Sequence, residues 1–446
     1  MNYKNMSTSR VLELSPSNKT TDNKYAYKLG VAQVTFDIPE GNYLLDPSSL
    51  RIAGGLRLYT TGSTAPTGQL LSMSSRLGVY SCFRSLIWRS GKHHTILSQE
   101  NHYNRWLSTY LPLQSSTENA LSFMSATALT MPNYEVFKDS VVEKASSNEF
   151  CVHLPCGITN SGQSLNLMPN ALGGCQLTIM LESDASALQV LPADNTTAPD
   201  TSTLLDAYYE LDNVVLICSV ITPAVDELSR LMKATTGSMT FQSIHNFYDT
   251  ANSTNIQISL NLGLKKCKSL FTSWISSNKL NNLGADSFAT LSPTNLDGTL
   301  APIKRLTWLK GGRAFNKLYP VDTNFNTISN TISEDVVLTE DYLNSVASFD
   351  KNMNVSANVS NVNRGWVGGT SGFGTPYQLV NDSGVVWGLG LNYENYLGGS
   401  GIALDKENFG LSIECDLTTS NAQSIFIFAN AESQIVWNEN GVQLIQ

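Results

Sequence analysis

The dominant pattern along the chain is an alternation of apolar and polar residues with a period of two. In residues 33–38, Val34, Phe36 and Ile38 fall on one face and three polar residues fall on the other. The same alternation returns in three later segments, 175–182, 256–263 and 411–417. A period of two is that of a half-buried β-strand. The chain is therefore predicted to be mostly β-structure.

The C-terminal run 433–446 predicts a β-hairpin. Asn440-Gly441 stands between two apolar stretches, and both residue types tolerate the positive φ of a tight hairpin turn. We therefore expect the chain to end as a strand held in a sheet.

Helical signals occur in two short segments. In the clearer one, 222–236, Thr222 can cap the helix, Pro223 fits its first position and Gly237 is a stop signal. The weaker one runs from Thr339 to Phe349. The apolar stripe predicted for the first helix consists of Val225, Leu228 and Met232. Many strands with only two short helices indicate all-β sandwiches.

The long apolar strand predicted at 208–221 leads straight into the helix at 222–236, which we interpret as a linker between two sandwiches. The predicted division is an N-terminal arm or tail at 1–24, a first sandwich at 25–221 and a second at 222–446. The polar residues 1–24 are compatible with either an ordered arm or a disordered tail.

Glycine is concentrated near the C-terminus, since twelve of the 31 glycines fall between Gly365 and Gly410. Together with the aromatic residues among them, they predict long loops at about 364–410 rather than helix or strand interiors. Such loops either make contacts with other molecules or are tolerant surface loops, and the sequence leaves both readings open.

The polar surface is mostly uncharged. Ser, Thr and Asn account for 131 of the 446 residues, or 29%, against 15% charged residues, and the net charge is -9. A net negative charge argues against a protein whose main role is to bind nucleic-acid phosphates, so we expect no direct genome binding. The composition also excludes a long coiled coil. The 41% of hydrophobic residues can bury at least one core, which argues against wholesale disorder.

The seven cysteines are spread thinly, and several lie inside apolar strand-like runs, which favours buried thiols in a reducing compartment. Residues 1–24 contain no apolar core of a signal peptide, and no stretch approaches the roughly 18 apolar residues of a membrane helix. We expect neither standard secretion nor a membrane span.

Catalytic motifs are missing from the sequence: G-x-S-x-G, H-E-x-x-H and C-x-x-C do not occur, and there is no P-loop. His93, His94 and His102 could ligate a metal, but adjacent strand residues point to opposite faces and only Glu100 lies nearby. We therefore predict no catalytic residue, no metal site and no cofactor.

Two further groups of residues are candidates for a metal, redox or nucleic-acid site. Cys151 and Cys156 bracket His153, but this spacing is not that of a zinc or redox site, so we interpret them as buried structural thiols. Basic residues cluster at 265–268 and at 304–317, where Trp308 and Phe315 could form a platform for single-stranded nucleic acid. In a chain of net charge -9, contact with an acidic partner or subunit is favoured.

Four segments, taken in order, resemble those of double jelly-roll major capsid proteins, in particular those of polinton-like viruses and virophages. They are 41–59 (GNYLLDPSSLRIAGGLRLY), 81–111 with Tyr103, Arg105 and Trp106 in its aromatic-rich part, 149–181, and 208–232. The resemblance covers residues 40 to 275. Farther on, the Asn-Pro-Phe segment usual in the second jelly roll is missing, and Ser287-Phe288 stand in its place.

The resemblance implies two tandem jelly-roll sandwiches and no enzyme activity. It implies a major capsid protein that forms homotrimeric, pseudo-hexagonal capsomers tiling the icosahedral shell of a double-stranded DNA virus. The expected partners are copies of the chain together with penton and minor or cement proteins, and the expected location is the virion, assembled inside the host cell.

Two other classes of function remain open from the residues alone. Aromatic residues in the loop 366–377 could stack on a sugar, as in a β-sandwich glycan-binding or adhesive protein. A β-rich hydrolase with an unrecognised site is the third hypothesis, which the missing motifs disfavour.

Overall fold

The computed structural model describes most of the chain. The described residues are 7–59, 69–74, 77–114, 127–128, 148–192, 207–251, 253, 255–260, 263–285, 287–288, 303–314, 321–322, 365–366, 379–380, 390–392, 401–405, 408–415 and 422–446.

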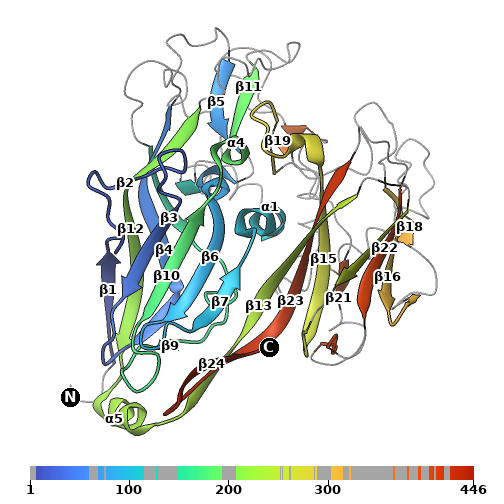
Figure 1. Cartoon of the computed structure of the whole chain (residues 1–446). Helices are drawn as coiled ribbons and strands as arrows, with labels where there is room; N and C mark the ends of the chain where they lie inside the picture. The colour runs from blue at the N-terminus through green and yellow to red at the C-terminus, as the bar shows by residue number, and fades with distance from the viewer. Residues whose placement is uncertain are drawn as a thin grey trace.

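Residues 7–222, here called the N-terminal half, form two main antiparallel sheets (Figure 1). One has the order β1-β12-β4-β8, with β2 and β9 attached, the other has the order β3-β10-β6-β7, and β5 pairs with β11. The strands are β1 (Thr8–Leu14), β2 (Lys24–Tyr25), β3 (Gln33–Ile38), β4 (Leu44–Tyr59), β5 (Gln69–Met73), β6 (Phe83–Ser90), β7 (Ile96–Glu100), β8 (Asn148–His153), β9 (Leu165–Asn166), β10 (Cys175–Leu181), β11 (Leu188–Pro192) and β12 (Tyr208–Thr222).

Residues 237–446, the C-terminal half, form two further main sheets, of order β13-β23-β15-β21 with β24 attached and β14-β22-β16-β17 with β18 attached. The strands are β13 (Gly237–Ala251), β14 (Asn255–Leu260), β15 (Cys267–Ser276), β16 (Ile303–Lys310), β17 (Arg313–Ala314), β18 (Val321–Asp322), β19 (Gly365–Trp366), β20 (Leu379–Val380), β21 (Gly390–Asn392), β22 (Phe409–Cys415), β23 (Gln423–Asn438) and β24 (Gly441–Ile445). In the described part of the chain, no sheet contains strands of both halves.

Helices are few. They are α1 (Tyr103–Gln114), α4 (Asp184–Ala187), α5 (Val225–Lys233) and the 3-10 turns η2 (Gly78–Cys82) and η4 (Ser277–Lys279). The predicted all-β class is confirmed. The weaker predicted helix, Thr339 to Phe349, lies outside the described residues.

The alternation predicted strands correctly. Val34, Phe36 and Ile38 in β3 are buried, as are the alternate residues of β10, with which β3 pairs. Thr35 and Thr178 lie on the opposite face of the sheet and are also buried. Their hydroxyls lie 3.4 Å apart and hydrogen-bond to each other, which lowers the cost of burying them.

The C-terminal hairpin is confirmed, but its turn lies one residue earlier than predicted. Asn438 pairs with Gly441, so Glu439 and Asn440 form the turn, and the Asn440 N–H donates to Asn438 Oδ1 at 2.9 Å. Of these residues only Gly441 has a positive φ, +136°. The side-chain acceptor of Asn438 stabilises the turn.

Helix α5 forms within the segment predicted as a helix, but its details differ. Ala224 is the N-cap residue, because Thr222 is still part of β12. No residue of α5 is buried, and Val225 and Met232 are more than half exposed, so the predicted apolar stripe does not face a core. Gly237 begins β13, where a Cβ would lie 2.3 Å from the Trp437 ring, so any other residue would require that ring to shift.

Helix α1 was not predicted. Its buried residues Tyr103, Trp106, Leu107 and Leu111 are spaced i, i+3, i+4 and i+8, which is the helical period, so the sequence did carry its signal. Figure 1 shows α1 between β6 and β7 of the N-terminal half and β13 and β23 of the C-terminal half.

Strands also form in two segments for which no strand was predicted. In the segment predicted as an arm or tail, Thr8–Leu14 form β1, which pairs with β12 over its whole length. In the segment predicted as glycine-rich loops, β19 pairs with β20 and β21 pairs with β15, and most of the other residues lie outside the described part of the chain.

Candidate functional site: the seam between the two halves

One face of the sheet of β13 and β23 packs against the N-terminal half, and we call this contact the seam. Paired residues of antiparallel strands share a face. Tyr248 pairs with Phe426, Ile244 with Asn430, and Gln242 with Glu432. Met239, Phe241, Phe271, Phe288 and Phe428 belong to the same apolar cluster as the core of the N-terminal half. The two halves therefore share one continuous core.

Helix α1 closes one end of the seam with aromatic contacts. The Arg105 guanidinium carbon lies 4.2 Å from the centre of the Phe288 ring and 5.5 Å from that of Phe426. The His102 ring packs against Phe426 at 5.3 Å and Tyr248 at 6.2 Å. These contacts place a charged residue of one half over rings of the other, where the ring faces attract it.

Asn104 fixes α1 to the N-terminal half. Its fully buried Nδ2 donates to Glu182 Oε2 at 2.9 Å and to the Ser81 carbonyl at 3.2 Å. The hydroxyl of Tyr209 donates to the Glu182 carbonyl at 2.6 Å. Because Glu182 directly follows β10, Ser81 lies in η2 and Tyr209 lies in β12, the helix is held in one orientation.

Next along the seam, Glu100 at the end of β7 is almost completely buried. Its Oε1 accepts hydrogen bonds from the Ser98 hydroxyl at 3.0 Å and from the Gly157 N–H at 3.2 Å, whereas Oε2 has no partner among the described residues. Burial raises the pKa of Glu100 to about 7, and the two hydrogen bonds oppose that rise.

Gly157 lies directly against β13 of the C-terminal half. A Cβ on Gly157 would lie 1.9 Å from the Gln242 carbonyl oxygen of β13, so no other residue fits without a shift of the backbone. Nothing in the local sequence distinguishes Gly157 from an ordinary loop glycine. Its importance follows only from the position of the other half.

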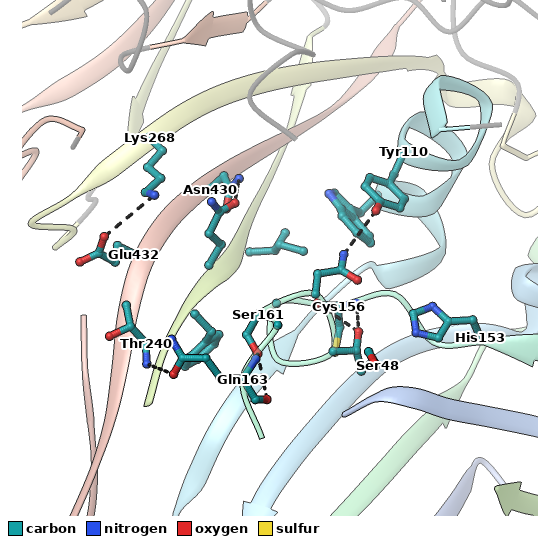
Figure 2. A pocket seen from close by; sticks show the side chains of 18 of the residues that line it. Ser48, Tyr110, His153, Cys156, Ser161, Gln163, Thr240, Lys268, Asn430 and Glu432 are labelled. Carbon is teal, nitrogen blue, oxygen red and sulfur yellow. Dashed lines mark hydrogen bonds and ion pairs between the residues drawn. The ribbon is translucent and has the colours of Figure 1, made fainter. Parts of the chain in front are cut away.

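Beyond Gly157 the seam opens into a groove of about 770 Å³. Figure 2 shows Lys268, Asn430 and Glu432 on one side of it, Tyr110 on α1 across from them, and Ser161 and Gln163 on the loop between. The groove is lined by Ser48, Arg51, Trp106, Tyr110, His153, Cys156, Gly157, Thr159, Asn160, Ser161, Gly162, Gln163, Thr240, Phe241, Gln242, Ile244, Lys268, Asn430 and Glu432. Most of these side chains are neutral and polar.

Two ionisable groups of the groove have pKa values shifted away from neutral pH. Burial raises the pKa of the Cys156 thiol to about 12, and burial with the nearby Arg51 charge lowers the pKa of His153 to about 4. Near neutral pH the thiol is therefore protonated and the imidazole is uncharged. The Tyr110 hydroxyl accepts a hydrogen bond from Asn160 Nδ2 at 3.3 Å. The predicted absence of catalytic residues stays a prediction.

In the structure, the three histidines that were candidate metal ligands lie apart from one another. His93 and His94 are exposed in the turn between β6 and β7, whereas His102 is half-buried at the seam. The described residues contain no group of three His, Cys, Asp or Glu side chains that could hold a metal ion. The described part of the chain also contains no helix long and apolar enough to cross a bilayer.

The structure corrects the interpretation of one of the two cysteines. Cys156 is buried as expected, but Cys151 is exposed, because it points away from the core in β8. The other described cysteines, Cys82, Cys175, Cys218 and Cys267, are buried and free.

The two basic clusters have different environments. Lys266 pairs with Glu432 at 2.5 Å, and Lys268 lies 4.0 Å from the same carboxylate, so the first cluster adjoins the groove. In the second cluster Trp308 is buried and stacks on Phe409 at 5.7 Å, which removes it as a platform for nucleic-acid bases. Phe315 lies outside the described residues, as does nearly all of the loop 366–377 considered for sugar binding.

No family model matches the sequence, and no curated protein matches it. Solved structures do match. The PBCV-1 virus capsid aligns with a TM-score of 0.57 and 11% identity over 99% of this chain and 97% of that chain. The fold is the double jelly roll of viral major capsid proteins.

Two further structures extend this likeness. The Faustovirus major capsid protein aligns with a TM-score of 0.57 and 10% identity over 97% of this chain and 91% of its own. A chain of the Sputnik virophage aligns with a TM-score of 0.55 and 10% identity over 98% and 88%. The double jelly roll of this chain is thus similar to those of three viral particles at about 10% identity.

Proposed function

We propose that this protein is the major capsid protein of an icosahedral double-stranded DNA virus and forms homotrimeric, pseudo-hexagonal capsomers. The observation that supports the proposal best is the extent of the fold match, which covers 99% of this chain and 97% of the PBCV-1 capsid chain. A shared sandwich alone would fit many functions, whereas two sandwiches in tandem over the whole length of both chains are a far more specific arrangement.

The proposal includes the division of the chain into two jelly rolls at 25–221 and 222–446, with α5 as the link. Three chains of two similar wedges would give a six-sided outline. It also includes the virion as the location, contacts between capsomers, penton and minor or cement proteins as partners, and no enzyme activity.

The physical properties of the chain support a shell protein. A surface rich in Ser, Thr and Asn offers many uncharged hydrogen-bonding groups, and identical neighbours can meet without adding up like charges. The shared core across the seam makes each copy a rigid unit. A subunit that is repeated many times in a shell requires such rigidity.

Light scattering on the purified protein tests the proposal. We expect a mass of three times 48.6 kDa and, by electron microscopy, particles of pseudo-hexagonal outline. A protein that stays monomeric at high concentration would contradict it.

A further inference from the structure

Two sheet edges meet at the seam without pairing. β7 is the last strand in the order of its sheet, and β13 is the last strand of the sheet opposite. The two strands are in contact, yet among the described strands no sheet contains members of both halves (Figure 1). Side chains and loop packing, rather than a ladder of backbone hydrogen bonds, therefore hold the halves together here.

The loop that contains Gly157 lies between these two edges. On one side, the Gly157 N–H donates to Glu100 Oε1 of β7 at 3.2 Å. On the other side, Gly157 lies directly against the Gln242 carbonyl of β13. Gly157 also lines the groove. The Glu100 carboxyl is thus the group of β7 that binds the loop seated on β13, and a movement of that loop changes the groove.

The Glu100 carboxyl has no compensating charge. The residue is 1% exposed, and Oε2 has no hydrogen-bond partner in the described part of the chain. No cation there contributes to the pKa of Glu100. Burying a carboxylate without a cation costs far more than burying a carboxylic acid. Protonation of Glu100 therefore favours the closed seam, and ionisation favours states in which water reaches the carboxylate.

The titratable groups next to Glu100 do not supply that charge. They are the Tyr103 phenol on α1 and the Cys156 thiol beside Gly157. Burial raises the pKa of the thiol to about 12 and the pKa of the phenol well above its usual value. Both groups are therefore uncharged near neutral pH.

The charged and titratable groups farther along the seam act differently. The Arg105 cation on α1 lies over the rings of Phe288 and Phe426. Burial lowers the pKa of His102, and it lowers the pKa of His245 on β13 as well. Protonation of these histidines would favour opening as pH falls, which is opposite in direction to the effect of Glu100.

We propose that Glu100 is a pH-dependent switch between the two halves: its protonated carboxyl keeps the Gly157 loop on β13, and its ionisation lets the seam open locally at the groove. The inference goes beyond the proposed function, because it concerns a contact within one chain.

The direction of the pH dependence follows from the two environments of the carboxyl. The pKa of Glu100 is about 7 in the closed seam, whereas an opened, hydrated carboxyl has the ordinary value of 4.5. Opening therefore becomes easier as pH rises from about 4.5 to about 7, and it changes little above that range.

Hydrogen exchange measures this local opening in the purified full-length protein. After correction for the intrinsic exchange rate at each pH, we expect opening of residues 154–163 and of β13 to increase about tenfold between pH 6 and pH 8. Opening that stays constant or falls over this interval would overturn the inference. An increase that continues beyond pH 8 would overturn it too, since another group would then be responsible.

The variant Glu100→Gln assigns the effect to one side chain. Its amide oxygen still accepts the Gly157 hydrogen bond but cannot ionise, so we expect opening to change by less than about twofold between pH 6 and pH 8. The control Glu149→Gln, at an exposed carboxylate, should keep the wild-type pH dependence. A wild-type dependence in Glu100→Gln would overturn the inference.

A second variant decides the question if Glu100→Gln fails to fold, as judged by its thermal melt. The Ser98 hydroxyl donates to Glu100 Oε1 at 3.0 Å and lowers the pKa of the carboxyl. Ser98→Ala removes this bond, so the pH at which opening levels off should move upward. A transition that stays at the wild-type pH would overturn the inference.

The outcomes separate this inference from the proposed function. A trimer whose opening does not depend on pH would overturn the switch and leave the capsid proposal standing. A monomer with the expected pH dependence would contradict the capsid proposal and support the switch.

Discussion

The two ends of the seam use the same two strands in different ways. At the end near α1, Tyr248 and Phe426 are covered by His102 and Arg105, and the contact is tightly packed. At the other end, the same face carries Gln242, Asn430 and Glu432 and lines the groove. The seam is thus apolar where the halves are held together and polar where a surface remains available. The closed end is expected to stabilise the fold, whereas the open end leaves polar side chains of the groove accessible.

The largest effect is expected at the closed end. Phe288→Ala removes a fully buried ring from the shared core and the partner of Arg105, and we expect a loss of about 3 to 5 kcal/mol of unfolding free energy. Urea denaturation measures it. The control Phe288→Leu keeps an apolar side chain and is expected to lose less than about 1.5 kcal/mol. Equal losses for both variants would contradict the role assigned to the ring contact.

The buried carboxyl between the two ends gives a pH-dependent effect. The pKa of Glu100 is about 7 in the folded protein, against an ordinary value of 4.5, so between these values the folded state binds more protons than the unfolded state. The contribution of Glu100 to stability therefore falls as pH rises from about 4.5 to about 7 and is constant above that range.

Glu100→Gln removes this dependence, because a neutral amide still accepts the Gly157 hydrogen bond. At pH 8 the variant is expected to be more stable than the wild type by up to about 3 kcal/mol, and at pH 4 the difference should vanish. Urea titrations at both pH values measure this, with Glu149→Gln, at an exposed carboxylate, as the control. A difference that does not vary with pH would refute the assignment.

A smaller effect is expected at the contact between Gly157 and β13. Gly157→Ala inserts a methyl group against the Gln242 carbonyl, and such overpacking costs about 1 to 3 kcal/mol. Hydrogen exchange should rise in β13 and around Gly157 if the halves separate locally. Gly263→Ala, at an exposed glycine with no atom within 4 Å of the added Cβ, is the matched control. If hydrogen exchange in β13 and around Gly157 is unchanged in Gly157→Ala, the contact between Gly157 and Gln242 is not tight.

Prediction from the sequence succeeded where the pattern was local. The strands around Phe36 and Leu177 and the final hairpin followed from alternation within a few residues. It failed where a distant segment decided the outcome. The apolar stripe predicted for α5 is such a case, because Val225 and Met232 are more than half exposed in the folded chain. Helix α1 differs, because the spacing of Tyr103, Trp106 and Leu107 is a local helical signal.

The site was not predictable from the sequence. Lys268 looked like one basic residue among several, and its direction depends on a bulge in the pairing of β15 with β23. Glu100 looked like a lone carboxylate near histidines, and its raised pKa depends on burial by other strands. These properties are set by pairing and packing over more than a hundred residues of sequence.

The sequence by itself determined the all-β class, the period-two strands, the final hairpin and the scarcity of charge, because each depends on the identity and order of neighbouring residues. Only the tertiary structure decided that the two halves share a core, that Gly157 can have no side chain and that the seam opens into a groove. These features arise from contacts between segments that are far apart in the chain. They depend on where the backbone lies in space and not on local residue preferences.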